Sequence, residues 1–337
     1  MKGAKMKHII LDIDSVGDDM LAVLYAAHHP DIDILGITTV NGACGSIEQA
    51  NHVALKMVEL TGKEIPVYSG AAEMLNPRKD SVDGDPVNFE EVLRPKLGER
   101  LDKFNEVMSP TARKVEEMKA EDFIIQMAYQ YEKELVVVTT GPTTNLAKAL
   151  CKDKTIAEKI GKVYMLGGNF QIAGNITPAS EYNIWADPEA AQIILRSDLQ
   201  VVLVPLDICE NNEFADGMMT RDHLADLSVG AGPVCRFIMD KFPIYIDIWR
   251  EFFQLAGFPM DDVITVALVA EEELCTYSEP VFVDIELNGD ITRGMTVAYF
   301  GHQIVHNVRK EHRNVRIAQS VQGKKFMNLF VETLKGK

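Results

Sequence analysis

Long apolar runs are missing from this chain of 337 residues, because no stretch approaches the roughly 20 consecutive apolar residues that span a membrane. The opening segment, Met1–Lys7, is basic, but it leads directly into an expected strand and lacks a small-residue cleavage site. We therefore expect a soluble, cytoplasmic protein.

Cysteine and basic residues are also scarce. The five cysteines are spread along the chain with no C-x-x-C pair, which favours free thiols in a reducing compartment over a disulfide framework. The 50 acidic residues outnumber the 34 Lys and Arg residues, and the net charge is −16. Because nucleic acids require a basic face, we expect a small-molecule partner and no nucleic acid.

Strand-like apolar runs alternate with helical patterns, which predicts βαβ units. We expect an α/β fold with an open, mostly parallel sheet flanked by helices, in a single domain over residues 1–337. The expected strands are Lys7–Asp14, Ile32–Val40, Pro66–Tyr68, Leu135–Thr139, Val163–Met165, Val201–Pro205 and Val281–Leu287. The expected helices are Asp18–His29, Ile47–Thr61, Thr143–Lys152, Pro188–Arg196 and Lys325–Leu334.

Two segments interrupt this rhythm. A polar insertion over about 76–110 contains the turn sequence Asp83-Gly84-Asp85-Pro86; such a length favours a functional lid, with disorder as the alternative. A second region, about 227–258, is mainly helical by pattern and rich in aromatic residues, among them Tyr245 and Trp249. Their spacing suits one helix face, so core packing is the default interpretation.

The most informative feature is an acidic turn after the first expected strand. Asp12 and Asp14 share one face of that strand, whereas Asp18 and Asp19 open the following helix behind Gly17. Helix capping accounts for one or two of these acids, but not for four. Because four repelling carboxylates are costly to bring together, we expect a divalent cation here. Only oxygen ligands are in view, which favours Ca²⁺ or Mg²⁺ over Zn²⁺.

Three later segments also place polar groups directly after an expected strand or directly before an expected helix. The strand Leu135–Thr139 ends in Thr140-Gly141-Pro142, which would present backbone carbonyls beside the first strand. The stretch 166–183 combines glycines with Asn175, Glu181 and Asn183, side chains suited to vicinal hydroxyls. Asp261-Asp262 precedes an apolar helix. Taken singly, each has a structural alternative: a strand end, a turn or a helix cap.

Together these segments resemble the nucleoside hydrolases, the Ca²⁺-dependent, inosine-uridine preferring N-ribohydrolases. The family's opening motif D-x-D-P-G-x-D-D stands here as Asp12-Ile13-Asp14-Ser15-Val16-Gly17-Asp18-Asp19, with all four acids in spacing and the Pro-Gly pair replaced. Further matches follow in order as far as Gly294-Met295-Thr296-Val297. The resemblance implies the family's Rossmann-like fold and a homodimer or homotetramer.

The resemblance also implies a set of site residues. One Ca²⁺ per chain would be bound by Asp14, Asp19, Asp262 and the backbone carbonyl of Thr140, with Asp14 as general base toward a metal-bound water. Asp12 would orient the ligands. The residues implied to hold the ribose hydroxyls are Asp18, Asn175, Glu181 and Asn183. The implied reaction is hydrolysis of the N-glycosidic bond of ribonucleosides through an oxocarbenium-like transition state.

The chain departs from the family on the side of the base. Asp261 stands where well-characterised members have a histidine before the last Asp ligand, and no histidine lies between His52 and His223. The family's Asn after the second strand falls on Ala43, so that Asn41 is the nearest substitute. How the base is activated stays open. The candidates for the base side are Asp261, Trp249, Tyr245 and Asn41.

Two other functions fit part of the pattern. Haloacid-dehalogenase-like phosphatases also open with a strand and D-x-D, but Gly17-Asp18-Asp19 and the missing Lys near Asp262 do not suit them. A non-catalytic nucleoside- or ribose-binding protein would keep the metal site without the leaving-group acid. The missing histidines leave this second alternative open.

Overall fold

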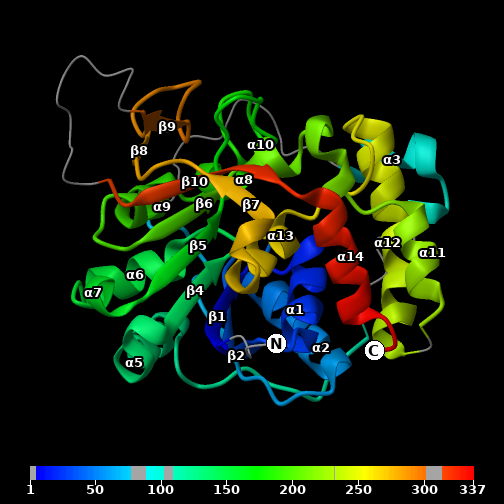
Figure 1. The fold of residues 1–337 in the computed structure, drawn as a ribbon, viewed down its shortest axis with the longest axis horizontal. Helices are drawn as coiled ribbons and strands as arrows, with labels where there is room; N and C mark the ends of the chain where they lie inside the picture. Colours follow the sequence, from blue (N-terminus) through cyan, green and yellow to red (C-terminus); the bar gives the residue numbers. More distant parts are fainter. Residues whose placement is uncertain (1–4, 77–88, 102–108, 231, 301–312) are drawn as a thin grey trace.

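The computed structural model describes residues 5–76, 89–101, 109–230, 232–300 and 313–337. An eight-stranded sheet runs through the centre in the order β3-β2-β1-β4-β5-β6-β10-β7 (Figure 1). Neighbouring strands from β3 to β10 run parallel, and β7 runs antiparallel to β10. The strands are β1 (Lys7–Ile13), β2 (Ile32–Thr39), β3 (Val67–Ser69), β4 (Leu135–Thr139), β5 (Lys162–Leu166), β6 (Val201–Val204), β7 (Cys275–Tyr277) and β10 (Val315–Val321). The expected open, mostly parallel sheet is confirmed.

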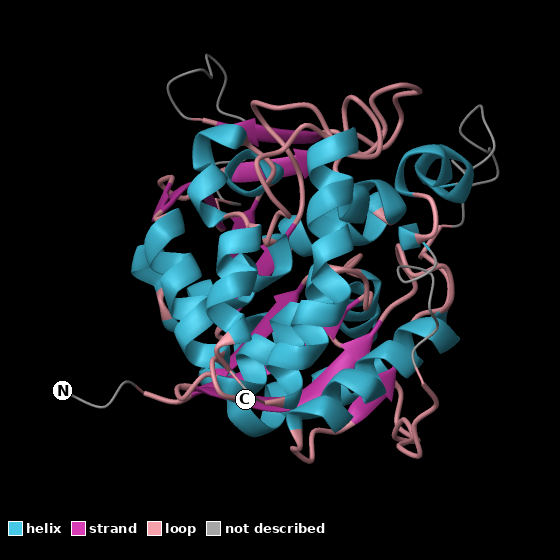
Figure 2. Cartoon of the chain, turned by 90° about the vertical axis from the view of Figure 1, so that its right-hand side faces the viewer, coloured by secondary structure: helices cyan, strands magenta, loops and turns pink. Residues whose placement is uncertain are grey.

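Helices cover the strands on both sides (Figures 1 and 2). Along β1, Ile9 and Leu11 belong to the apolar core under α1, α2, α13 and α14, whereas Ile10 belongs to the core under α5, α6 and α9. This alternation explains why β1 reads as a continuous apolar run. The helices of the two layers are α1 (Asp18–His28), α2 (Ile47–Thr61), α5 (Ala120–Tyr131), α6 (Thr144–Lys152), α7 (Ile156–Lys159), α9 (Pro188–Leu195), α13 (Asp261–Ala270) and α14 (Gly323–Leu334).

Shorter elements gather around the carboxyl ends of the parallel strands. They include α8 (Tyr182–Ala186), α10 (Leu206–Cys209) and a hairpin of β8 (Phe282–Ile285) with β9 (Thr296–Tyr299). The expected strand at 281–287 therefore lies outside the main sheet. Short 3₁₀ segments occur at Glu132–Glu134, Asn212–Gly217 and Glu272–Leu274. Among the described helices, none is both long and apolar enough to cross a membrane.

The aromatic region and the polar insertion contact each other. Helices α11 (Arg221–Ser228) and α12 (Pro233–Phe252) form most of the region expected to be helical. Helix α3 (Phe89–Leu97) belongs to the insertion, and Leu93 and Leu97 pack against Ile244 and Ile248 of α12. Residues 77–88 and 102–108 of the expected lid lie outside the described part of the chain.

Candidate active site

The strand order reverses at β1, which lies between β2 and β4 although β4 follows much later in the chain. Such a switch point opens a crevice at the carboxyl ends of the strands, where α/β sheets bind ligands. Asp14 follows the last residue of β1, and Thr140 follows the last residue of β4. The Thr140 N–H donates to the Asp12 carbonyl at 2.9 Å, so the two strand ends lie side by side. The acidic turn therefore lies at the ligand-binding edge of the sheet.

Asp12 ties three elements together beneath this edge. Its Oδ1 accepts hydrogen bonds from Thr38 Oγ1 of β2 at 2.6 Å and from Asn145 Nδ2 of α6 at 2.7 Å. Burial raises the pKa of Asp12 to about 7. This position suits the orienting role implied by the resemblance, because the carboxyl group fixes the strand that ends directly before Asp14.

Asp14 and Asp19 face each other at the edge itself. Asp14 Oδ2 accepts the N–H of Ala43 at 2.9 Å, and Asp19 Oδ1 accepts the Thr140 hydroxyl at 2.5 Å. The two carboxyl groups lie within hydrogen-bonding reach of each other. Burial, and then the charge of Asp19, raise the pKa of Asp14 well above its usual range.

Asp262 joins this pair from the far end of the chain. Helix α13 begins at Asp261 and packs on α1, and the Asp262 N–H donates to Asp18 Oδ2 at 2.8 Å. The side chain of Asp262 also hydrogen-bonds with Asp18 and Asp19. Burial, and then the charges of Asp18, Asp19, Asp14 and Asp261, raise the pKa of Asp262 well above its usual range. The fold thus brings together Asp14, Asp18, Asp19 and Asp262.

Glycines make room for these acids. A Cβ on Gly42 would collide with the Asp14 carboxylate, and one on Gly141 would lie 2.9 Å from the Asp14 Cβ. The turn itself is left-handed at Ser15, with φ of 66°, and at Gly17, with φ of 49°. Because proline is locked near −65°, the turn at Ser15 takes a shape that the Pro-Gly pair of the family motif does not allow.

The donor chemistry fits a hard divalent cation. Asp14, Asp19 and Asp262 are at most 5% exposed. Burial raises the pKa of each, and the charges of neighbouring carboxylates raise it further in Asp14 and Asp262. A cation with oxygen ligands offsets such repulsion. The side chains nevertheless bond to one another, and within the described part of the chain no three acidic, His or Cys side chains already form a metal-binding group. The Thr140 carbonyl accepts the Asn183 amide at 2.8 Å and keeps a second lone pair.

Apart from Asp18, which opens α1, the residues implied to hold ribose lie in the segment from the end of β5 to α8. Glu181 caps α8: its carboxylate accepts N–H bonds from Asn183 at 2.7 Å, Ile184 at 3.0 Å and Gly168 at 3.1 Å. Burial raises the pKa of Glu181 to about 7. Asn175 is exposed and hydrogen-bonds with Glu210 at 3.0 Å. Glu181 therefore acts as a helix cap, which was its structural alternative. Asn183, in contrast, contacts the acidic edge through its hydrogen bond to the Thr140 carbonyl.

The base-side candidates separate into three surroundings. The Asp261 carboxyl group hydrogen-bonds with Glu210, and burial, and then the Glu210 charge, raise its pKa well above the usual range. Tyr245 and Trp249 belong to an aromatic cluster around Phe258, with ring centroids 5.4 and 5.3 Å from it. Burial, and then the Asp18 charge, raise the pKa of Tyr245. A Cβ on Gly17 would lie 3.8 Å from Cε1 of Tyr245, so the ring lies beside the acidic turn.

Asn41 does not join these groups, since its amide donates to the Ala72 carbonyl at 2.9 Å and so supports the loop after β3. Two further residues beside the site were not among the sequence candidates. Burial, and then the Asp14 charge, raise the pKa of Tyr182, and Glu210 contacts both Asn175 and Asp261. Glu210 directly follows α10 and not a strand, so the signal that identified Asp14 does not identify Glu210.

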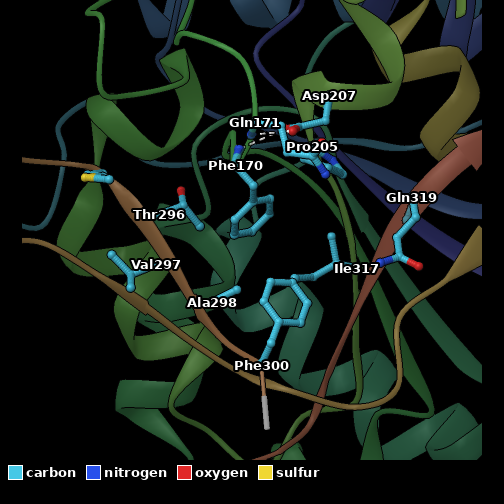
Figure 3. A pocket seen from close by; sticks show the side chains of 12 residues that line it. Phe170, Gln171, Pro205, Asp207, Thr296, Val297, Ala298, Phe300, Ile317 and Gln319 are labelled. Atoms are coloured by element: carbon cyan, nitrogen blue, oxygen red, sulfur yellow. Dashed lines mark hydrogen bonds between the residues drawn. The ribbon is translucent and has the colours of Figure 1, made fainter. Parts of the chain in front are cut away.

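A cavity of about 410 Å³ lies apart from these acids (Figure 3). It is bordered by β9, β10 and the loop after β5, and the rings of Phe170 and Phe300 face it. None of the sequence-derived candidates is among its lining residues. The candidate active site is therefore defined by the acidic edge of the sheet and not by this cavity.

Comparisons with known proteins agree along nearly the whole chain. The model of the inosine-uridine preferring nucleoside hydrolase family matches residues 9–328. The inosine-uridine preferring nucleoside hydrolase of Crithidia fasciculata is 31% identical over 333 residues, or 97% of each chain. Probable uridine nucleosidase 2 of Arabidopsis thaliana is 30% identical over 87% of this chain and 86% of its own. A solved purine-preferring ribonucleoside hydrolase from Gardnerella vaginalis is 30% identical, with a TM-score of 0.83 over 98% of each chain.

Proposed function

This chain belongs to the inosine-uridine preferring nucleoside hydrolase family, enzymes that act on the N-glycosidic bonds of ribonucleosides, and we propose that it performs this hydrolysis with one Ca²⁺ at the acidic edge. The observation that carries the proposal is the meeting of Asp14, Asp18 and Asp19 with Asp262 at the switch point of the sheet. The match across residues 9–328 leaves the phosphatase interpretation without support.

Asp14, Asp19, Asp262 and the Thr140 carbonyl would hold the cation. When bound, calcium favours the ionised forms of these acids and acts as a Lewis acid toward water and sugar hydroxyls. Buried carboxylates without such a partner are costly. We therefore expect the site to bind calcium through oxygen ligands that come from early, middle and late segments of the chain.

Asp14 is the proposed general base. The Ala43 N–H holds its Oδ2, and Gly42 and Gly141 leave the space in which its carboxylate lies. From this position, Asp14 takes the proton of the water that attacks the anomeric carbon. Asp18, Asn175, Glu181 and Asn183 bind the ribose hydroxyls. Carboxylates close to the ring stabilise the positive charge that develops as the N-glycosidic bond breaks.

The base leaves toward Asp261, Tyr245 and Trp249 in this proposal. Tyr245 lies beside Asp18, and Asp261 precedes the proposed ligand Asp262. No histidine directly precedes the proposed ligand Asp262, so Asp261, Tyr245 and Trp249 would determine how the leaving base is stabilised. Relatives differ in base preference by their descriptions, purine-preferring in one and uridine-directed in another.

A substrate panel tests the proposal. The purified protein with Ca²⁺ is given inosine, guanosine, adenosine, uridine and cytidine, and reducing sugar and free base are measured. We expect release from at least one nucleoside, abolished by chelator and by Asp14→Ala. Tight nucleoside binding without release would instead identify a binding protein that has lost catalysis.

A further inference from the structure

Helix α10 holds the loop that carries the ribose-side residues. This loop, residues 167–181, runs from the end of β5 to the start of α8. The Leu206 N–H donates to the Gly168 carbonyl at 3.0 Å. The buried carboxylate of Asp207 accepts the N–H groups of Phe170 at 2.9 Å and Gln171 at 2.6 Å (Figure 3). Three hydrogen bonds therefore fix the first part of the loop to α10.

Glu210, directly after α10, holds the second part of the loop through a side chain. Its Oε1 accepts Asn175 Nδ2 at 3.0 Å, while Asn175 Oδ1 accepts the Tyr182 N–H at 2.9 Å. Both ends of the Asn175 amide are thus engaged, and its orientation is fixed. Because an amide nitrogen carries two hydrogens, one N–H of Asn175 is left to donate to a ligand.

Glu210 also reaches the base side of the site, because its carboxyl group hydrogen-bonds with that of Asp261. Asp261 opens α13, the helix that carries Asp262. A single side chain therefore connects the ribose loop to the helix that carries a proposed metal ligand.

We propose that Glu210 is a positioning residue for nucleoside hydrolysis: it orients the Asn175 amide so that the remaining N–H donates to a ribose hydroxyl, and Asp207 anchors the same loop. This inference rests on the proposed function, because it takes ribose as the sugar bound at Asn175. Glu210 acts through Asn175 and does not touch the reacting atoms.

A double-mutant cycle tests the proposal. The variants are Glu210→Ala, Asn175→Ala and the double variant, and kcat/KM is measured for the best nucleoside. Loss of one positioned hydrogen bond is expected to lower kcat/KM about tenfold in Glu210→Ala. Glu210→Ala is expected to add no further loss in the Asn175→Ala background. Glu210→Gln, which keeps an acceptor oxygen, is expected to stay within about threefold of wild type.

Two measurements separate positioning from a general structural effect. Glu213→Gln removes an exposed acid three residues away and serves as the matched control. With 2′-, 3′- and 5′-deoxy forms of the best nucleoside, the effect of Glu210→Ala should vanish for the form that lacks the hydroxyl bound by Asn175. Additive losses in the cycle, or an equal loss for every deoxy form, would overturn the proposal.

The same cycle remains decisive if a variant or the reaction fails. Should Glu210→Ala not fold, Glu210→Asp replaces it, because it keeps the charge and shortens the side chain by one methylene. Should wild type cleave none of the nucleosides, the proposed hydrolysis fails, and the cycle is read from calorimetric nucleoside binding in the presence of calcium. Non-additive binding losses would then support the positioning role, and additive ones would contradict it.

Discussion

The backbone N–H of Asp262 donates to Asp18 Oδ2 at 2.8 Å, although 244 positions separate the two residues in the sequence. The contact joins the first turn of α1 to the first turn of α13. It brings an acid from the last quarter of the chain against three acids from its first twenty residues. A cluster of this kind exists only in the folded protein, so its ligand affinity and the stability of the fold are linked.

The first prediction concerns Asp262 as a metal ligand. Asp262→Asn removes one charged oxygen donor from the cluster and keeps the size of the side chain. We expect the affinity for calcium to fall by more than about 100-fold. Titration calorimetry measures this affinity on protein from which calcium has first been removed with a chelator. Glu213→Gln, which removes an exposed charge elsewhere, should leave affinity unchanged. Equal affinity in Asp262→Asn and wild type would show that the ligand assignment is wrong.

The second prediction concerns Asp14 as the general base. Asp14→Asn keeps the shape of the side chain but cannot accept the proton of the attacking water. We expect kcat to fall by about 10²- to 10⁴-fold, with far-ultraviolet circular dichroism unchanged. Steady-state release of reducing sugar provides the measurement. A variant that keeps most of the wild-type kcat would assign the base to another residue.

The third prediction concerns pH and calcium. Burial raises the pKa values of Asp12, Asp18 and Glu181 to about 7, so the folded protein binds their protons more tightly than the unfolded chain does. Their contribution to stability is present below about pH 4 and is lost as the pH rises through about 7.

In chelator, this contribution to Tm should therefore decline between pH 5 and pH 8. Calcium takes the place of these protons. The rise in Tm on adding calcium, the calcium increment, should therefore be larger at pH 8 than at pH 5. Differential scanning calorimetry at both pH values, with chelator and with calcium, measures the increment. An increment that is the same at both, or larger at pH 5, contradicts the linkage between burial and metal binding.

The fourth prediction concerns the space around Asp14. Gly42→Ala would press its Cβ against the Asp14 carboxylate, so we expect calcium affinity and kcat/KM each to fall at least about tenfold, because Asp14 must move. Gly217→Ala is the matched control: its Cβ would meet other atoms no closer than 3.6 Å, an ordinary contact. Comparable activity in the two variants would mean that the Asp14 position is not critical.

The sequence indicated the site best where acids follow a strand. The acids at 12–19 and the segment at 140–145 lie at strand ends, and parallel strands bring such ends to one edge of the sheet. Strand order is harder to predict from local periodicity. β10, for example, comes last in the chain but pairs with β6 and β7, and neither it nor α5 was among the expected elements. These placements depend on tertiary packing, which no local pattern encodes.

The supporting contacts were also beyond the sequence. Asp207 lies in α10 and Glu210 directly follows this helix, whereas Asp14 directly follows β1. The partners of Asp207 and Glu210 lie on a loop whose course depends on the whole fold. In the same way, the resemblance placed the Thr140 carbonyl in the metal shell, and only the structure shows that it accepts the Asn183 amide. A strand-end acid can thus be predicted, whereas its partner cannot.

The most direct measurement of the central claim is ribose release from the best nucleoside by one chelated preparation, titrated with calcium. We predict negligible release in chelator and a rise that saturates at one calcium per chain. Asp14→Asn should stay inactive at every calcium concentration. Full release in chelator, or calcium-dependent release by Asp14→Asn at the wild-type rate, would contradict the central claim.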